Sequence, residues 1–315
     1  MNRPVQTAKA IAVTLVVLLL TYLLGVWSAS QNMFLFRLPS FVSRLPAALL
    51  QAPRYRYDPV NRLASDTQKS AVPCPVQNER TAVLLVAGQS NAGNHGGQRF
   101  RSEHGAYIVN FFDGQCFTAA SPLLGSTGIS GEYWTLAGNS LVSAGAFDRV
   151  VIAPVAVGGS SIAHWAHGGQ LNAVLATVAV DLRDHGLRPT HVLWHQGESD
   201  VELGTSEAEY TKHFRSMADT LRTNGIAAPL FVSVASKCLP RYAPDNPIAR
   251  AQTALPNPGQ KIFAGVDSDA LLGELDRFDD CHFSGSGQRK IAEAWAEIVA
   301  GSPAPKPPAP KSPAH

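Results

Sequence analysis

A serine, a histidine and an aspartate occupy positions in the 315-residue chain that suit nucleophilic catalysis. Ser90 lies in a Gly-Gln-Ser-Asn turn directly after the apolar run of residues 81–87. Glycine permits a sharp turn, which can present both the serine hydroxyl and its backbone N–H at a strand's carboxyl end. Near the other end of the chain, Asp279 precedes His282 by three residues, so the carboxylate can fix the imidazole tautomer. Alone, Asp-x-x-His is more often a helix start or a surface pair, but together with the serine turn it favours a Ser90–His282–Asp279 triad.

Two further segments could stabilise the oxyanion of such a reaction. The sequence Val-Gly-Gly-Ser-Ser at residues 157–161 has small residues, which let a backbone N–H point into a cleft. Residues 194–200, Trp-His-Gln-Gly-Glu-Ser-Asp, form a dense polar set that needs partners if buried. Gln196 in this set is a candidate side-chain donor to the oxyanion.

The elements that must position these residues alternate between strand and helix patterns. Short apolar, β-branched runs predict strands at residues 81–87, 106–111, 149–157, 190–195, 229–236 and 262–266. Apolar spacings of three and four predict helices at residues 132–145, 170–185, 206–224 and 286–299. Such alternation predicts a parallel sheet covered by helices on both faces, with ligands bound beyond the strands' carboxyl ends.

Four short motifs occur in the order typical of one enzyme group: Gly-Gln-Ser-Asn, Gly-Gly-x-Ser, Gln-Gly-Glu-x-Asp and a C-terminal Asp-x-x-His. Over roughly residues 80–300 the chain therefore resembles the SGNH hydrolase superfamily, within it the sialate O-acetylesterase-like and acetylxylan esterase group. The resemblance implies a flavodoxin-like three-layer α/β/α fold. It also implies a serine-esterase mechanism without cofactor or metal, and O-acetylated carbohydrate as substrate.

Carried over by position, the resemblance makes Ser90 the nucleophile, with Asp279 and His282 completing the triad. The oxyanion donors it implies are the backbone N–H groups of Ser90 and Gly159 and the side chain of Gln196, which stands where the wider superfamily has asparagine.

Other residues near the motifs have less defined expected roles. Asn91 is expected to brace the turn. Glu198 matches a family glutamate, which either orients the histidine in place of Asp279 or accepts a hydrogen bond in the cleft wall. Trp134 and Trp165 are core residues or, alternatively, walls that stack on sugar. The spacings of His95, His164, His167 and His195 do not resemble a zinc site, and structural roles are expected for them.

The N-terminal part of the chain predicts contact with a membrane. Residues 10–28 are apolar and uncharged, about the length that spans a bilayer. Arg3 and Lys9 precede them and the next basic residue is Arg37, which places residues 1–9 in the cytoplasm and the rest outside. The segment is interpreted as an uncleaved signal-anchor of a bacterial inner-membrane type, the alternative being secretion after cleavage of a signal peptide.

The remaining segments are assigned by composition. The proline-rich residues 29–79 are expected to be a linker partly packed on the esterase domain, residues 80–300. Residues 301–315, rich in Pro, Ala and Lys, are expected to be a disordered tail. A net charge of +2 without a basic, aromatic cluster argues against a nucleic-acid partner.

Export would allow disulfides among the four cysteines. We predict pairing of Cys74 with Cys116 and of Cys238 with Cys281, although three connectivities are open.

The sequence thus predicts a membrane-anchored, extracytoplasmic esterase that removes O-acetyl groups from glycans through an acyl-enzyme. The alternatives are an esterase of other acyl specificity, a glycan O-acetyltransferase, or a non-catalytic carbohydrate-binding module.

Overall fold

The computed structural model describes residues 15–23, 54–238 and 243–302. The chain divides into two compact units, residues 1–53 and residues 54–315. Residues 15–23 form a helix in the first unit. None of the helices in the described part of the chain has the length and apolar character needed to cross a membrane. Most of the predicted anchor and nearly all of the predicted tail lie outside the described residues.

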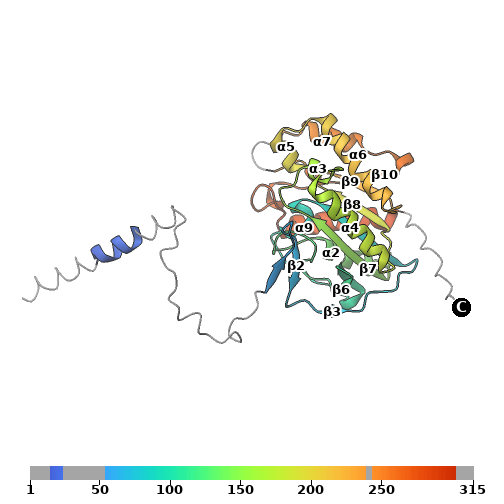
Figure 1. The fold of residues 1–315 in the computed structure, drawn as a ribbon, viewed down its shortest axis with the longest axis horizontal. Coiled ribbons are helices and arrows are strands. Elements are labelled where there is room, and N and C mark those ends of the chain that lie inside the picture. Colours follow the sequence, from blue (N-terminus) through green and yellow to red (C-terminus); the bar gives the residue numbers. More distant parts are fainter. Residues whose placement is uncertain (1–14, 24–53, 239–242, 303–315) are drawn as a thin grey trace, which may run out of the picture. The chain divides into compact units, whose positions relative to one another are not determined.

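The second unit is built on an eight-stranded sheet with the order β10-β9-β8-β4-β7-β5-β6-β3 (Figure 1). Its strands, in chain order, are β3 (Ala71–Val72), β4 (Thr81–Gly88), β5 (Ile108–Phe112), β6 (Gln115–Thr118), β7 (Arg149–Ala156), β8 (His191–His195), β9 (Leu230–Val234) and β10 (Ile262–Asp267). The strands from β10 to β5 pair in parallel, and β6 and β3 continue the sheet in antiparallel pairing. All six predicted strands are present, and they form the parallel part.

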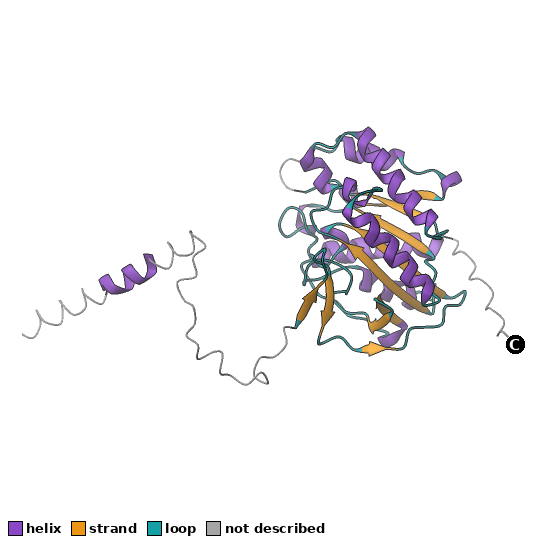
Figure 2. Ribbon diagram, viewed as in Figure 1, coloured by secondary structure: helices purple, strands orange, loops and turns teal. Residues whose placement is uncertain are grey.

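Helices cover both faces of this sheet (Figure 2). The helices described in this unit are α2 (Trp134–Ser143), α3 (Ile162–Trp165), α4 (Gln170–Asp184), α5 (Glu198–Leu203), α6 (Glu207–Thr223), α7 (Pro247–Ala254), α8 (Ser268–Leu271) and α9 (Gly285–Gly301). The central strand β4 shows why two layers form, because every residue of it is buried. Val83, Leu85 and Ala87 join the core beneath α4, α6 and α7. The alternate residues Ala82, Leu84 and Val86 join the core beneath α2 and α9.

Of the predicted linker, residues 29–79, only residues 54–79 are described, and they contain three strands. Besides β3, a separate two-stranded antiparallel sheet is formed by β1 (Tyr55–Tyr57) and β2 (Leu63–Asp66). This β1–β2 hairpin and strand β6 are not among the strands that the sequence pattern predicts.

The strand order reverses at β4, because the chain passes from β7 on one side of it to β8 on the other. Ligand sites of open parallel sheets form where such a reversal separates the loops at the carboxyl ends of the strands. Ser90 follows β4 directly, so the candidate nucleophile lies at this point of the sheet.

Candidate active site

The turn that carries Ser90 depends on a glycine at the end of β4. Gly88 has φ +148, and a Cβ there would lie 1.9 Å from the backbone oxygen of His195. Only glycine therefore lets β4 approach β8 so closely. Ser90 begins a single 3-10 turn, Ser90–Ala92, and lines a cavity of about 810 Å³. The turn thus holds the hydroxyl-bearing residue at the cavity wall rather than inside the core.

His282 lines the same cavity and is held by Asp279. The ring nitrogen Nδ1 of His282 lies 2.7 Å from Asp279 Oδ2, and Asp279 Oδ1 accepts the His282 backbone N–H at 2.6 Å. Partial burial raises the pKa of the Asp279 carboxyl, but the hydrogen bonds from His282 outweigh it and keep the pKa below its usual value. An ionised Asp279 bonded to Nδ1 leaves Nε2 as the nitrogen that can accept a proton.

Gly159 lines the cavity in a left-handed conformation, with φ +72. No atom lies within 4 Å of the place where a Cβ would stand, so conformation rather than space selects glycine here. The backbone N–H of the preceding Gly158 donates to Thr127 Oγ1 at 2.8 Å. Gly158 is therefore already engaged, and Gly159 is the candidate backbone donor of this loop.

Gln196, predicted as an oxyanion donor, does not reach the cavity. Its side chain is fully buried and does not line the cavity. The amide nitrogen Nε2 donates to the backbone oxygen of Ser160 at 3.0 Å and to Asp200 Oδ2 at 2.5 Å. The expected oxyanion role for Gln196 is wrong for this arrangement, because its amide hydrogens are already used. Instead, Gln196 and Asp200 tie the loop that contains Gly159 to helix α5.

Asn91 and Glu198 form a hydrogen bond between the serine turn and α5. Asn91 Nδ2 donates to Glu198 Oε1 at 2.7 Å and to the backbone oxygen of Cys281 at 3.3 Å. The expected bracing role of Asn91 therefore extends to the loop that carries His282. Glu198 lines the cavity, but Asp279, not Glu198, bonds the ring of His282.

The buried surroundings of Glu198 change its protonation. Burial raises its pKa to about 7, against the hydrogen bond from Asn91. His195 Nε2 lies 3.9 Å from Glu198 Oε1. Neither His195 Nε2 nor Glu198 Oε2 has a hydrogen-bond partner in the described part of the chain. The carboxyl of Glu198 is thus a buried, incompletely bonded group at the cavity.

Residues 80–300 match the family model described as carbohydrate esterase, sialic acid-specific acetylesterase. The chain belongs to this family. It is therefore a carboxylic ester hydrolase of the carbohydrate-deacetylating type, and the predicted resemblance to sialate O-acetylesterases is confirmed. No protein of curated function matches the chain.

Several solved structures are similar to this esterase at low sequence identity. A protein of Arabidopsis thaliana superimposes with a TM-score of 0.57 at 20% identity, over 70% of this chain and 98% of that chain. The structure of NanS gives a TM-score of 0.48 at 17% identity, over 71% of this chain and 98% of that chain. A family 3 carbohydrate esterase of Clostridium thermocellum gives a TM-score of 0.44 at 17% identity, over 70% of this chain and 100% of that chain.

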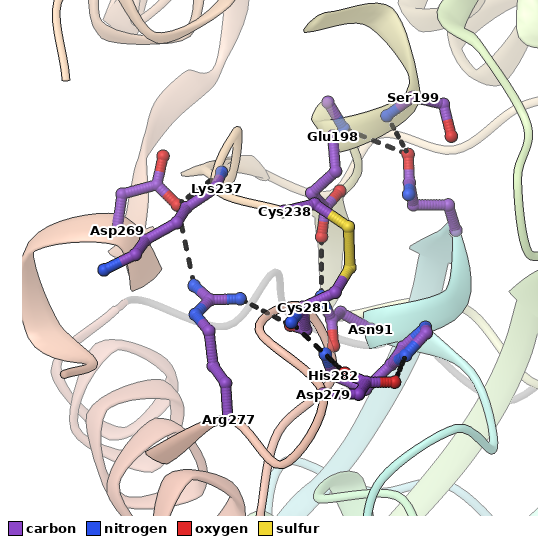
Figure 3. The surroundings of a disulfide bond; sticks show 12 residues. Asn91, Glu198, Ser199, Lys237, Cys238, Asp269, Arg277, Asp279, Cys281 and His282 are labelled. Atoms are coloured by element: carbon purple, nitrogen blue, oxygen red, sulfur yellow. Dashed lines mark hydrogen bonds and ion pairs between the residues drawn. A yellow bond between two sulfur atoms is a disulfide. The ribbon is translucent and has the colours of Figure 1, made fainter. Parts of the chain in front are cut away.

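Both predicted disulfides of the esterase are confirmed: Cys74–Cys116 and Cys238–Cys281. Figure 3 shows the second one beside Asn91, Glu198 and the Asp279–His282 pair. Cys281 immediately precedes His282, so this disulfide ties the loop that carries His282 to the segment that follows β9. Disulfides are typical of proteins that fold outside the cytoplasm.

The two tryptophans considered as sugar-stacking walls belong to the core. Trp134 and Trp165 are fully buried. The indole N–H of Trp134 donates to the backbone oxygen of Ala92 at 2.8 Å, and that of Trp165 to Ser160 Oγ at 3.0 Å. From the core, Trp134 contacts the serine turn and Trp165 contacts the glycine loop. Because neither ring is exposed, a stacking role for them is wrong.

His95, expected to be a structural histidine, lies against His282, the candidate catalytic histidine. Its ring stacks on His282 with centroids 5.4 Å apart, and its Nε2 lies 3.1 Å from Thr127 Oγ1. Burial, aided by the nearby His282, lowers the pKa of His95 to about 4, so His95 stays neutral beside His282. Its place five residues after Ser90 is the one signal that could have indicated this.

Proposed function

We propose that the protein is a serine esterase that removes O-acetyl groups from carbohydrate through an acyl-enzyme formed on Ser90. The observation that carries the proposal is the 2.7 Å contact between His282 Nδ1 and Asp279 in a cavity that Ser90 also lines. Its position beyond the carboxyl end of β4, together with the family, supports acyl transfer as the chemistry.

In this mechanism His282 Nε2 accepts the Ser90 proton while Ser90 Oγ bonds to the acetyl carbon. The bond between that carbon and the sugar oxygen then breaks, and His282 returns the proton to the departing sugar hydroxyl. Water, deprotonated by His282, attacks the acyl-enzyme and releases acetate and free Ser90. Asp279, kept ionised by its hydrogen bonds, stabilises the imidazolium at each step.

The tetrahedral oxyanion is stabilised by the backbone N–H groups of Ser90 and Gly159. Both residues line the cavity, and the neighbouring N–H of Gly158 is engaged by Thr127. Because Gln196 is bonded elsewhere, these two backbone groups are the donors that the arrangement offers. Loss of one such donor costs about 10²–10³ in turnover.

Acetate release from acetylated glycans tests the proposal, with wild type compared with Ser90→Ala. We expect the variant to lose about 10⁴-fold or more in turnover, because the nucleophile is absent. Ser199→Ala is a matched control, since Ser199 is another serine on the cavity wall and should not be needed for turnover. Equal acetate release by wild type and Ser90→Ala would refute the acyl-enzyme. Acetyl transfer to an added glycan in place of acetate release would indicate a transferase instead.

We further propose that residues 10–28 deliver the esterase domain to the extracytoplasmic side, as an anchor or as a cleaved leader. The disulfides support folding outside the cytoplasm. Fractionation of cells expressing the full chain separates the two possibilities. A membrane-bound protein of full length supports an anchor, a shortened soluble protein supports cleavage, and reduced cysteines in the cytoplasm would contradict both.

A further inference from the structure

The β1–β2 hairpin lies before the residues that match the family model, yet it forms part of the active-site cavity. The match begins at residue 80, whereas the hairpin spans residues 55–66. Tyr57, Val60 and Asn61 of the hairpin line the same cavity as Ser90 and His282. The segment that matches the family model therefore does not form the whole wall of this site.

The hairpin is fixed to the domain by its second strand. Leu63 is fully buried, and its backbone N–H donates to the oxygen of Ser126 at 2.8 Å. The N–H of Gly125 donates in turn to the oxygen of Leu63 at 2.8 Å. Residues 127–129, which follow this anchor point directly, also line the cavity. The hairpin and that wall are thus held together by backbone hydrogen bonds.

Side-chain contacts hold the shape of the hairpin at both ends. At the open end, Arg54 donates two hydrogen bonds to Asp66, at 3.0 and 3.1 Å. At the tip, Asp58 accepts the Arg62 backbone N–H at 2.8 Å and Arg62 Nε at 2.7 Å. Asn61 at the tip has φ +64, a conformation that asparagine tolerates well. A hairpin held in this way presents a preformed surface rather than one ordered by the ligand.

The surface that the tip presents suits a sugar ring. Tyr57 keeps 47% of its surface exposed while lining the cavity, unlike the fully buried Tyr133 and Tyr210. An exposed aromatic ring can pack on the apolar face of a pyranose, and a neighbouring amide can bond its hydroxyls. An acetyl group fills only a small part of the cavity of about 810 Å³, which leaves room for the alcohol part of the ester.

We propose that Tyr57 and Asn61 form the subsite that binds the pyranose ring of the acetylated glycan, and so determine the specificity of the esterase. Tyr57 packs on the ring, Asn61 bonds its hydroxyls, and Val60 with Ile129 completes the apolar wall. This inference rests on the proposed function, since it assigns the alcohol part of the substrate for the same reaction.

The test compares two kinds of ester for each variant. Ethyl acetate has an alcohol too small to occupy the subsite, whereas O-acetylated xylotriose and O-acetylated sialic acid both carry pyranose rings. For Tyr57→Ala we expect the ratio of kcat/KM on the better glycan to that on ethyl acetate to fall about tenfold, through a higher KM. Tyr57→Phe should restore most of that ratio, because it keeps the aromatic face. Tyr107→Ala is the matched control, since Tyr107 is 52% exposed but does not line the cavity.

Binding to Ser90→Ala protein, measured by calorimetry with the same two glycans, separates this inference from the proposed function. A Kd raised about tenfold by Tyr57→Ala in that background supports the subsite whether or not the wild type turns the glycan over. An unchanged Kd, or an equal loss on both kinds of ester, overturns the subsite. Retention of activity by Ser90→Ala alone would refute the acyl-enzyme while leaving the subsite to be judged by the binding result.

Discussion

The buried carboxyl of Glu198 predicts a specific dependence of stability on pH. Its pKa rises from 4.5 to about 7, chiefly because burial disfavours the charged form. A group whose pKa is raised on folding stabilises the protein below its unfolded pKa and loses that contribution as pH rises through the folded value. The shift corresponds to about 3 kcal/mol in total, most of which is lost between about pH 5 and pH 8.

Glu198→Gln removes this titration and keeps an oxygen that can accept the hydrogen bond from Asn91. The free energy of unfolding, measured in urea with disulfides intact, should therefore be higher for the variant than for wild type near pH 8, with a smaller difference near pH 5. Burial lowers the pKa of His195 to about 3, so the contribution of His195 to the free energy of unfolding rises with pH below about 6.5. Both proteins contain His195, so comparing them at each pH cancels this contribution.

Glu202→Gln is the matched control for this measurement, because Glu202 lies on the same helix but is exposed. For Glu202→Gln, the difference from wild type in the free energy of unfolding should be the same near pH 5 and near pH 8. If the difference between Glu198→Gln and wild type is also the same at about pH 5 and pH 8, the reasoning from burial is refuted.

Three other changes have effects that follow from single contacts. Asp279→Asn should lower kcat by about 10³–10⁴-fold with little change in fold, since it leaves His282 in place with the wrong tautomer; normal kcat would contradict the triad. Replacing Cys238 and Cys281 by serine opens a link across 43 residues, so we expect a loss of about 3–4 kcal/mol in urea unfolding, and no loss would show that the link contributes nothing. Gly88→Ala should abolish folding or cost more than about 3 kcal/mol by circular dichroism, because its Cβ would overlap β8; a native melting temperature would show that β4 can move.

The parallel part of the sheet could be predicted because its strands are continuous apolar runs. Every residue of β4 is buried, which leaves an unbroken hydrophobic segment in the sequence. Strands β1 and β3 are two or three residues long, and the exposed side chains of Tyr57 and Arg56 give no apolar alternation. Strand β3 pairs with β6, far along the chain, so no local pattern indicates that pairing.

Some contacts of the candidate site could likewise be predicted from the sequence, and others are determined only by the fold. The Asp279–His282 contact and the Ser90 turn could be predicted because each depends on residues only a few positions apart. The direction of the Gln196 side chain depends on Ser160 and Asp200, and a motif does not contain that information. Likewise, the stacking of His95 on His282 joins residues almost 190 positions apart, which only the fold brings together.

Several contacts that fix His282 converge on the residue before it. The backbone oxygen of Cys281 accepts hydrogen bonds from Asn91 Nδ2 at 3.3 Å and from Arg277 Nη1 at 2.6 Å, and its side chain forms the disulfide (Figure 3). Contacts that restrain one residue should not act independently, because each limits the movement that loss of another would allow.

We therefore expect Asn91→Ala combined with serine at Cys238 and Cys281 to reduce kcat by more than the product of the separate losses. The excess should correspond to a coupling free energy of about 0.5–3 kcal/mol. As a matched control, serine at Cys74 and Cys116 removes the other disulfide, which does not line the cavity, and should combine with Asn91→Ala additively. Additive losses for both disulfides would mean that Asn91 and the Cys238–Cys281 disulfide act on His282 independently, which would refute the coupling.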